Sequence, residues 1–416
     1  MSQKIQAPRG TTDVLAQDAD ARAALEATAR RVLEAAGYRR VETPTFEHTE
    51  LFSRGVGAST DIVQKEMYTF DDGGGRSVTL RPEGTAPICR AYAEHGMHKL
   101  PQPVKLWYLS SFFRKEKPQA GRFRQFWQVG AEALGCNDPA VDAETILLLS
   151  TLLAELGVGD VRLRLGSLGT PATRTAYREE LQAHLRERAD ELSEEVRARI
   201  DLNPLRAFDS DHPGTIAVMR DAPRLLDRLD ADDAEHFAEV RALLDGAGVV
   251  YEIDTTLVRG MDYYTRTVFE FTSDKLGAQS GVAGGGRYDG LVEQLGGPPT
   301  PGCGWAAGIE RILLAGPEQP VAPPPVDLYV AFDSPGQRRE AFAVAAEARD
   351  ARLNAQLELA GRSRKGQLKQ ADRIGARYVA LLGDSGAVLK DMQGGEQRDV
   401  QAGEVVTRIL RERGMR

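Results

Sequence analysis

The sequence predicts an α+β domain with a helical insertion, followed by a smaller α/β domain. Three observations support this prediction. Strand-like segments joined by short turns run through residues 67–134, and a highly charged segment with few β-branched residues, typical of helices, covers residues 171–244. After a stiff linker at 317–326, which contains five prolines, strands alternate with helices. We therefore expect domains at 1–316 and 327–416.

Periodicity, turn residues and capping residues predict the elements of the first domain. Apolar residues at a helical spacing predict a long N-terminal helix that ends at Gly37. The strand after it stops before Pro44, because proline cannot donate to a sheet. Asp138-Pro139 is typical of a helix start. We expect helices over residues 18–36, from residue 86 onward, and over residues 139–156. We expect strands over residues 38–41, 67–70, 77–80, 104–114, 123–134, 161–165 and 265–271. Residues 302–314 are expected to form a strand that leads into a helix.

The second domain shows the alternation of an α/β unit. We expect strands over residues 327–332, 353–358 and 378–382, helices over 338–349, 365–374 and 404–413, and a hairpin across Gly394-Gly395. A nucleotide-binding flavodoxin-like module is the alternative. Its first strand-to-helix turn, at 333–337, lacks the glycine-rich fingerprint of such modules.

Composition narrows the classes of function. The net charge of −8 argues against a protein that coats nucleic acid through overall attraction. Two basic segments, 112–128 and 361–377, suit contact with one folded RNA at two places, or are solvated faces. No apolar run approaches the ~20 residues that span a bilayer, and the N-terminus lacks a signal-peptide core, so we expect a cytoplasmic protein. Three separated cysteines predict neither a disulfide framework nor a zinc cluster.

The densest polar chemistry lies in residues 257–271, ahead of a predicted strand. It comprises Arg259, Gly260, Asp262, Tyr263 and Tyr264. Two interpretations stay open on the residues alone. Arg259 and Asp262 form a local ion pair beside two core tyrosines, or the run belongs to a ligand site.

Three further runs place polar groups or glycines where elements begin or end. Glu83 and Thr85 stand between a strand and a helix, where they accept a substrate ammonium or only cap the helix. Arg114 presents a forked donor at a strand end, which suits a phosphate. The glycines at 284–286 mark a bend or a close approach of backbone to a ligand. The sequence contains no Gly-x-x-x-x-Gly-Lys-Ser/Thr run, which argues against a Walker-type ATPase.

The run at 259–265, Arg-Gly-Met-Asp-Tyr-Tyr-Thr, resembles the histidine-specific signature of histidyl-tRNA synthetases. Residues 18–44 resemble motif 1 of class II aminoacyl-tRNA synthetases, which forms the dimer interface in that class. Residues 113–126 resemble motif 2, and residues 302–314 resemble motif 3. The likeness covers essentially the full length. It implies an α+β catalytic domain with an antiparallel sheet of the class II synthetase type and a C-terminal α/β anticodon-binding domain.

The resemblance also implies a reaction and the residues that perform it. L-histidine is activated with ATP and Mg²⁺ and transferred to tRNA(His) by a homodimer, which contacts the tRNA at its acceptor end and anticodon. No metal ligand from the protein is implied. The implied residues are Arg259 and Arg114 for catalysis, Glu83, Thr85, Gln128, Glu132, Arg259, Tyr263, Tyr264 and Tyr288 for histidine, Arg114, Glu116, Phe126 and Arg311 for ATP, and Lys117, Gln119, Arg122, Arg362 and Lys365 for tRNA.

Trp127 departs from the family pattern, because many relatives have histidine at this position. Gln128 and Glu132 share one face of their strand, so Trp127 points the other way and leaves the pocket intact. The helical insertion at 171–244 has two open roles, a clamp on the tRNA acceptor stem or a surface elaboration.

Two other functions compete with this reading. The first is the non-catalytic synthetase-like regulatory subunit of ATP phosphoribosyltransferase, which usually lacks the C-terminal domain and disrupts the arginine run. This chain has both the C-terminal segment and Arg259. The second is a synthetase for another amino acid, which Glu132 with Tyr263 and Tyr264 opposes.

Overall fold

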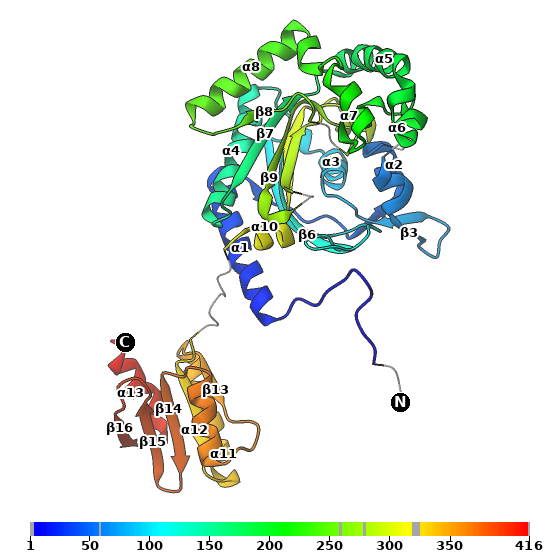
Figure 1. The fold of residues 1–416 in the computed structure, drawn as a ribbon. Helices are drawn as coiled ribbons and strands as arrows, with labels where there is room; N and C mark the ends of the chain where they lie inside the picture. Colours follow the sequence, from blue (N-terminus) through cyan, green and yellow to red (C-terminus); the bar gives the residue numbers. More distant parts are fainter. Residues whose placement is uncertain (1–3, 58–59, 258–259, 278–279, 318–324, 415–416) are drawn as a thin grey trace. The chain divides into compact units, whose positions relative to one another are not determined.

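The computed structural model describes residues 4–57, 60–257, 260–277, 280–317 and 325–414 (Figure 1). The chain divides into two compact units, Met1–Pro320 and Val321–Arg416. Most of the predicted linker, at 318–324, lies outside the described residues, as does Arg259, so the alternative of an Arg259–Asp262 ion pair stays open.

The first unit is built around an eight-stranded sheet with strand order β1-β5-β6-β11-β10-β9-β7-β8. The strands are β1 (Arg39–Arg40), β5 (Val104–Phe113), β6 (Gln125–Leu134), β7 (Val161–Ser167), β8 (Glu252–Ile253), β9 (Thr265–Ser273), β10 (Gly281–Arg287) and β11 (Gly302–Gly308). Neighbours from β5 to β7 pair antiparallel, whereas β1 and β8 pair parallel at the two edges. The antiparallel sheet that the sequence predicted is therefore confirmed.

Helices cover both faces of this sheet (Figure 1). One face packs against α1 (Ala16–Ala35), α4 (Pro139–Glu155), α8 (Ala231–Gly246) and α10 (Ile309–Ala315). The other packs against α2 (Thr49–Gly55), α3 (Thr85–Glu94), α5 (Pro171–Glu187), α7 (Pro213–Arg220) and α9 (Leu291–Gln294). A second sheet, in the order β2-β4-β3, joins β2 (Phe46–His48), β4 (Ser77–Leu80) and β3 (Tyr68–Asp71). The strand predicted at 38–41 shrinks to β1.

The glycine run at 284–286 is a strand, and the bend proposed for it is wrong. These residues lie in the middle of β10, hydrogen-bonded between β9 and β11. A Cβ added at Gly285 would lie 2.1 Å from the carbonyl oxygen of Gly304 and 2.7 Å from the Cβ of Trp305. Glycine at position 285 therefore lets three strands pack closely around Trp305. The other alternative, a close approach of this backbone to a ligand, stays a prediction.

The predicted insertion is helical, with α5, α6 (Glu194–Arg199), α7 and α8 joined by segments that contain short 3-10 helices. Its buried apolar residues belong to the two clusters on the faces of the large sheet. Tyr177 and Leu181 of α5 belong to the same buried cluster as Tyr288, and Phe237 and Val240 of α8 belong to the cluster around α4. The insertion therefore contributes to the packing on both faces of the large sheet.

The second unit is the α/β fold that the alternation predicted. Its sheet has the order β13-β12-β14-β15-β16, parallel across the first three strands and antiparallel beyond β14. The elements are β12 (Leu328–Phe332), α11 (Arg338–Asp350), β13 (Ala355–Leu357), α12 (Arg364–Arg373), β14 (Tyr378–Gly383), β15 (Gly386–Asp391), β16 (Gln397–Val400) and α13 (Val405–Glu412).

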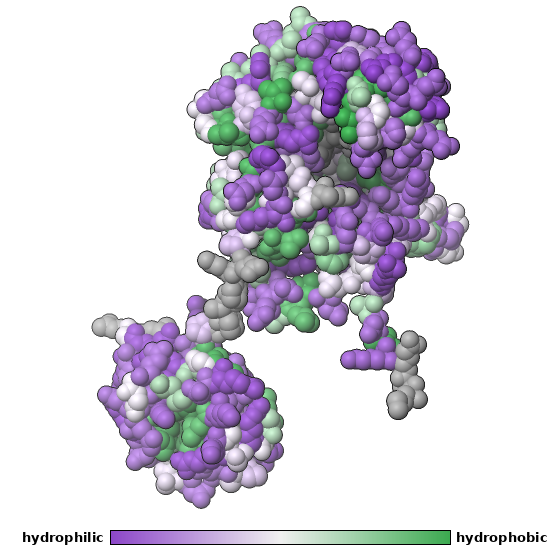
Figure 2. All heavy atoms as spheres, viewed as in Figure 1, coloured by the Kyte–Doolittle hydropathy of each residue, from purple (hydrophilic) through white to green (hydrophobic). Residues whose placement is uncertain are grey.

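Polar and charged residues cover most of the face in Figure 2, and apolar residues form small separate patches. In the described part of the chain, no helix is both long and apolar enough to cross a membrane. The cysteines are free thiols: Cys89 and Cys303 are buried and Cys136 is half-buried.

Candidate active site

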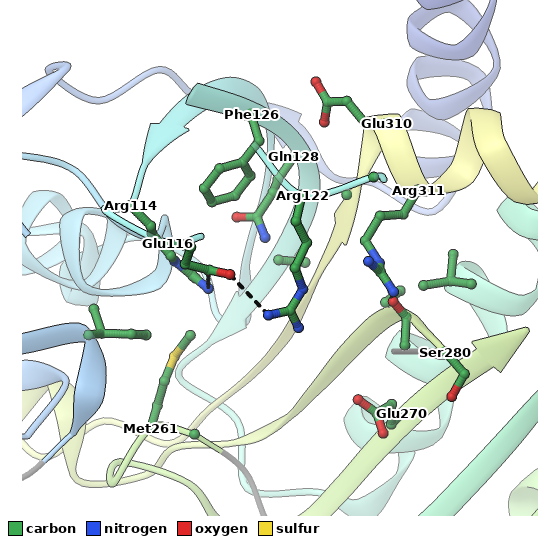
Figure 3. Close-up of a pocket in the computed structure, with 18 of the residues that line it drawn as sticks. Arg114, Glu116, Arg122, Phe126, Gln128, Met261, Glu270, Ser280, Glu310 and Arg311 are labelled. Atoms are coloured by element: carbon green, nitrogen blue, oxygen red, sulfur yellow. Dashed lines mark hydrogen bonds and ion pairs between the residues drawn. The ribbon is translucent and has the colours of Figure 1, made fainter. Parts of the chain in front are cut away.

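A cavity of about 720 Å³ opens where β6 and β10 begin and β11 ends (Figure 3). Five arginines line it, and three of them come from the β5–β6 segment and α10. Arg114 directly follows β5, Arg122 lies in the loop between β5 and β6, and Arg311 lies in the first turn of α10. Phe126 and Gln128, at the start of β6, complete this wall. Three guanidinium groups beside an aromatic ring suit a ligand that carries both phosphates and a flat base.

Arg114 is oriented by contacts on three sides. Its Nε donates to the carbonyl oxygen of Pro82 at 2.9 Å, and its Nη1 lies 3.6 Å from a carboxylate oxygen of Glu116. Its guanidinium carbon lies 5.3 Å from the ring centroid of Phe126. The side chain is therefore held at the cavity wall by a backbone acceptor, a carboxylate and an aromatic ring, which leaves few rotamers to lose on binding.

Arg122 and Arg311 face the same cavity as Arg114. The Nη1 of Arg122 donates to Glu116 at 2.9 Å, so the Glu116 carboxylate forms one hydrogen bond with Arg122 and a longer ion pair with Arg114. Arg311 donates from Nε to the carbonyl oxygen of Gly281. Burial lowers the pKa of Arg311, and the nearby charge of Arg122 lowers it further. Two arginines that repel one another suit a bound polyanion, which relieves the repulsion.

Glu132 lies at the centre of a buried polar cluster beside the cavity. Thr85 donates its hydroxyl to one carboxylate oxygen at 2.8 Å, and Tyr288 donates to the other at 2.6 Å. Glu132 is 0% exposed. Burial raises the pKa of its carboxyl to about 8, although both hydrogen bonds oppose this rise. The site therefore holds a carboxyl group poised to change protonation near neutral pH.

Glu83 is held by the first turn of α3. Its carboxylate accepts the backbone N–H groups of Thr85 at 2.8 Å and Ala86 at 2.9 Å, and burial raises its pKa. The hydroxyl of Tyr263 lies 3.4 Å from the same carboxylate. The capping contacts that the sequence allowed are therefore present. They fix Glu83 within the polar cluster, so capping and substrate binding are compatible.

The tyrosines of the 257–271 run join the buried cluster to the cavity. The rings of Tyr263 and Tyr264 lie 4.8 Å apart, and the ring of Tyr288 lies 5.9 Å from that of Tyr263. The hydroxyl of Tyr263 donates to the sulfur of Met261, which lines the cavity. Leu257 and Gly260 line the cavity as well. The run therefore lies at the boundary between the two parts of the site.

Comparisons with known proteins agree with this geometry. Residues 10–312 match the family model described as Histidyl-tRNA synthetase. Histidine–tRNA ligase of Halorhodospira halophila is 50% identical, over 96% of this chain and 96% of its own. That of Desulforamulus reducens is 46% identical, over 96% and 97%. The apo histidyl-tRNA synthetase of S. aureus superposes with a TM-score of 0.81 at 34% identity, covering 98% of this chain and 100% of that chain.

The chain belongs to the histidyl-tRNA synthetase family. It is accordingly an aminoacyl-tRNA ligase, and its fold is the class II α+β fold with a C-terminal α/β domain. The chain matches histidine–tRNA ligases over nearly its full length at 46–50% identity, and this supports the ligase function over the regulatory-subunit alternative.

Within this synthetase, the predicted residues fall into three groups. The four residues assigned to ATP, which are Arg114, Glu116, Phe126 and Arg311, line the cavity together with Gln128, which was assigned to histidine. The remaining histidine residues form the buried cluster; those described are Glu83, Thr85, Glu132, Tyr263, Tyr264 and Tyr288. The predicted tRNA residues are divided. Lys117, Gln119, Arg362 and Lys365 are exposed, whereas Arg122 faces the cavity.

The two faces of β6 behave as the strand period predicted. Gln128 pairs with Ser110 and Glu132 with Leu106 in the β5–β6 register, so both lie on the site face. Trp127 lies on the opposite face, where the guanidinium of Arg22 stacks 4.4 Å from its ring centroid. Its backbone N–H donates to Glu310, at 3.1 and 3.2 Å to the two oxygens. Figure 3 shows Glu310 turned away from Arg311. The residue that departs from the family pattern therefore does not line the cavity.

Sequence reasoning missed Tyr108, which lies on the site face of β5. Its hydroxyl group is buried and has no hydrogen-bond partner among the described residues. A Cβ added at Gly84 or Gly130 would fall 2.7 or 2.4 Å from this hydroxyl, so glycines on both sides make room for it. The β5–β6 register places Tyr108 opposite Gly130, between Gln128 and Glu132. The long loop of residues 114–124 joins these two strands, so the sequence alone did not determine this register.

Proposed function

We propose that this synthetase binds histidine in the Glu132 cluster and ATP in the arginine-lined cavity, and transfers histidine to tRNA(His). The observation that carries the proposal is the junction of the two parts. A buried carboxyl held by Thr85 and Tyr288 lies beside a cavity lined by five arginines and Phe126. The Glu132 cluster has hydrogen-bonding groups that suit a polar ring, and the arginine-lined cavity has charges that suit a nucleoside triphosphate.

In the first step, an oxygen of the histidine carboxylate attacks the α-phosphorus of ATP. The bond from that phosphorus to the bridging oxygen breaks, giving histidyl-adenylate and pyrophosphate. Positioning and charge neutralisation dominate such chemistry. Arg114 and Arg311 hold phosphates, and Phe126 stacks on adenine. Because Arg122 faces the cavity and pairs with Glu116, we assign it to phosphate binding as well as to the acceptor end of the tRNA.

Arg259 is proposed to bridge the histidine carboxylate and the α-phosphate. Its chain neighbours Leu257, Gly260 and Met261 all line the cavity, which supports this placement. In the second step, a terminal ribose hydroxyl of the tRNA attacks the adenylate carbonyl and AMP leaves.

Glu132 and Tyr288 are proposed to recognise the imidazole, and Glu83, Thr85 and Gln128 the α-ammonium. The Oε1 of Gln128 is buried without a hydrogen-bond partner among the described residues, so a substrate ammonium supplies the missing donor. A site built to bond a polar ring rejects apolar analogues by ~10⁴ or more, and no editing site is required.

Mg²⁺ is proposed to enter with ATP. In the described part of the chain, no three His, Cys, Asp or Glu side chains are grouped so that they could hold a metal ion. Mg²⁺ does not require such a cluster, because it usually keeps several waters and binds through substrate phosphates and one or two carboxylates. Glu270, on β9 at the cavity wall, is the carboxylate proposed to hold it, where the ion would neutralise phosphate charge.

Two surfaces are proposed for partners. A second copy of the chain would pack against the region of α1 and β1, and a further candidate surface is the β2–β4–β3 sheet, where Phe46 and Phe70 form an exposed edge-to-face pair at 6.1 Å. The tRNA would contact Lys117 and Gln119 at the acceptor end, and Arg362 and Lys365 of the second unit at the anticodon. Because ribosomes consume the charged tRNA, we place the activity in the cytoplasm.

Histidine-dependent ATP–pyrophosphate exchange, followed by charging of purified tRNA(His), tests the proposal. Exchange should require histidine and fail with other amino acids. Arg259→Ala should abolish exchange without changing thermal stability, and Arg76→Ala is the matched control, because Arg76 is an exposed turn residue paired with Asp72. Absence of histidine-dependent exchange in the wild-type protein would refute the proposed function.

A further inference from the structure

Asp142, on α4, is the centre of a buried charge network outside the substrate site. Its carboxylate is 0% exposed and contacts three side chains from three other elements. His236 of α8 lies 2.6 Å away through Nε2, Thr267 of β9 donates at 2.9 Å, and Arg287 of β10 pairs with it at 2.7 Å. A buried carboxylate of this kind is stable only while its donors stay in place.

Arg287 links this network to the histidine cluster. Its side chain is 0% exposed, and it also donates to the carbonyl oxygens of Cys136 and Asp138 and to Asp289. The next residue is Tyr288, whose hydroxyl donates to Glu132 at 2.6 Å. Because the Arg287 guanidinium is bound on all sides, the backbone at the end of β10 has little freedom to move. This fixes the position of the Tyr288 backbone, from which its ring extends.

The insertion reaches the other tyrosine segment by separate contacts. Asp233 of α8 pairs with Arg266 at 2.8 Å, two residues after Tyr264. Arg174 of α5 donates to the carbonyl oxygen of Tyr264 at 2.5 Å. Two helices of the insertion, α5 and α8, are therefore fastened to the Tyr264 segment by buried or half-buried polar contacts.

A cavity of about 350 Å³ lies between the insertion and these segments, lined by Thr170, Arg174, Tyr263, Arg266 and Asp289. Continuous side-chain packing is therefore interrupted there. Where packing is interrupted, relative position depends on the few directional contacts that cross the gap.

We propose that His236, on the last helix of the insertion, is a positioning residue for histidine recognition: through Asp142 and Arg287 it holds Tyr288 against Glu132. The inference rests on the proposed function of that cluster. It gives the insertion a role in amino-acid binding, in place of the acceptor-stem clamp or surface elaboration. His236 touches no substrate, so its effect appears in the affinity for histidine and not for ATP.

Pyrophosphate exchange by His236→Leu, His236→Gln and Ile146→Ala tests this role in the full-length protein. His236→Leu removes the contact to Asp142, and we expect the KM for histidine to rise about tenfold with the KM for ATP unchanged. His236→Gln keeps a donor near the Nε2 position and should restore the wild-type KM. Ile146→Ala creates a void in the same helix as Asp142, without removing a contact of Arg287, and should lower stability alone.

Thr267→Val is a second route to the network, because it removes the hydroxyl that donates to Asp142 with little change in shape. It should raise the KM for histidine even where His236→Leu fails to fold. An unchanged histidine KM in a folded His236→Leu or Thr267→Val variant overturns the inference, as does an equal rise in Ile146→Ala. Wild-type protein without histidine-dependent exchange refutes the proposed function instead, so the two failures are distinguishable.

Discussion

Replacing Glu132 by glutamine should make the first unit more stable while weakening histidine binding. The carboxyl is fully buried, and burial raises its pKa from 4.5 to about 8. Each pKa unit is worth about 1.4 kcal/mol, so the displacement corresponds to about 5 kcal/mol. The neutral amide of Glu132→Gln avoids this cost. Its oxygen can accept from one of the two hydroxyls of Thr85 and Tyr288, and its NH2 group can donate to the other.

The sign and pH window of this effect follow from linkage. Between pH 4.5 and about 8, the unfolded chain has lost the Glu132 proton and the folded chain retains it. The wild-type free energy of unfolding therefore falls with rising pH in that window. The stability of Glu132→Gln relative to wild type should grow from near zero at about pH 4.5 and level off above about pH 8, reaching at least 2 kcal/mol once relaxation is allowed.

Tryptophan fluorescence during urea unfolding is a suitable measurement. The chain has three tryptophans, Trp107, Trp127 and Trp305, and all lie in the first unit, so unfolding of the second unit does not contribute directly. A stability difference that stays constant from pH 5 to 8 would contradict the assigned burial of the charge. In parallel, Glu132→Gln should raise the KM for histidine more than the KM for ATP, and an unchanged histidine KM would remove Glu132 from the recognition site.

Three further outcomes follow from the same geometry. Phe126→Ala should raise the KM for ATP about tenfold, because stacking on a base is worth ~1–3 kcal/mol, and pyrophosphate exchange at varied ATP measures it. Lys365→Ala should lower tRNA charging a few-fold and leave exchange unchanged, and a loss of exchange would contradict its place at the anticodon. This exposed residue is a cleaner probe than Arg362, which lies 3.2 Å from Glu358. Gly285→Ala should cost about 3 kcal/mol of stability in urea unfolding, because its Cβ would collide with the neighbouring strand.

Local pattern alone determined much of this protein. The period of a strand placed Gln128 and Glu132 on one face and Trp127 on the other, and the β5–β6 register confirms it. Turn and capping residues located most helices and strands to within two or three residues, because their causes are local in the chain. The resemblance in the 257–271 run identified the family, since that chemistry lies within a few consecutive residues.

Tertiary structure alone decided what depends on distant partners. The three glycines for which the sequence allowed a bend or a close approach to a ligand form the middle of β10. The strands on either side leave no room for a side chain at Gly285. Arg122, which the resemblance assigned to tRNA, faces the cavity, where Glu116 accepts a hydrogen bond from it. The contact between His236 and Asp142 joins residues 94 positions apart. Burial and charge pairing depend on which segments meet in space, and periodicity within one segment does not contain that information.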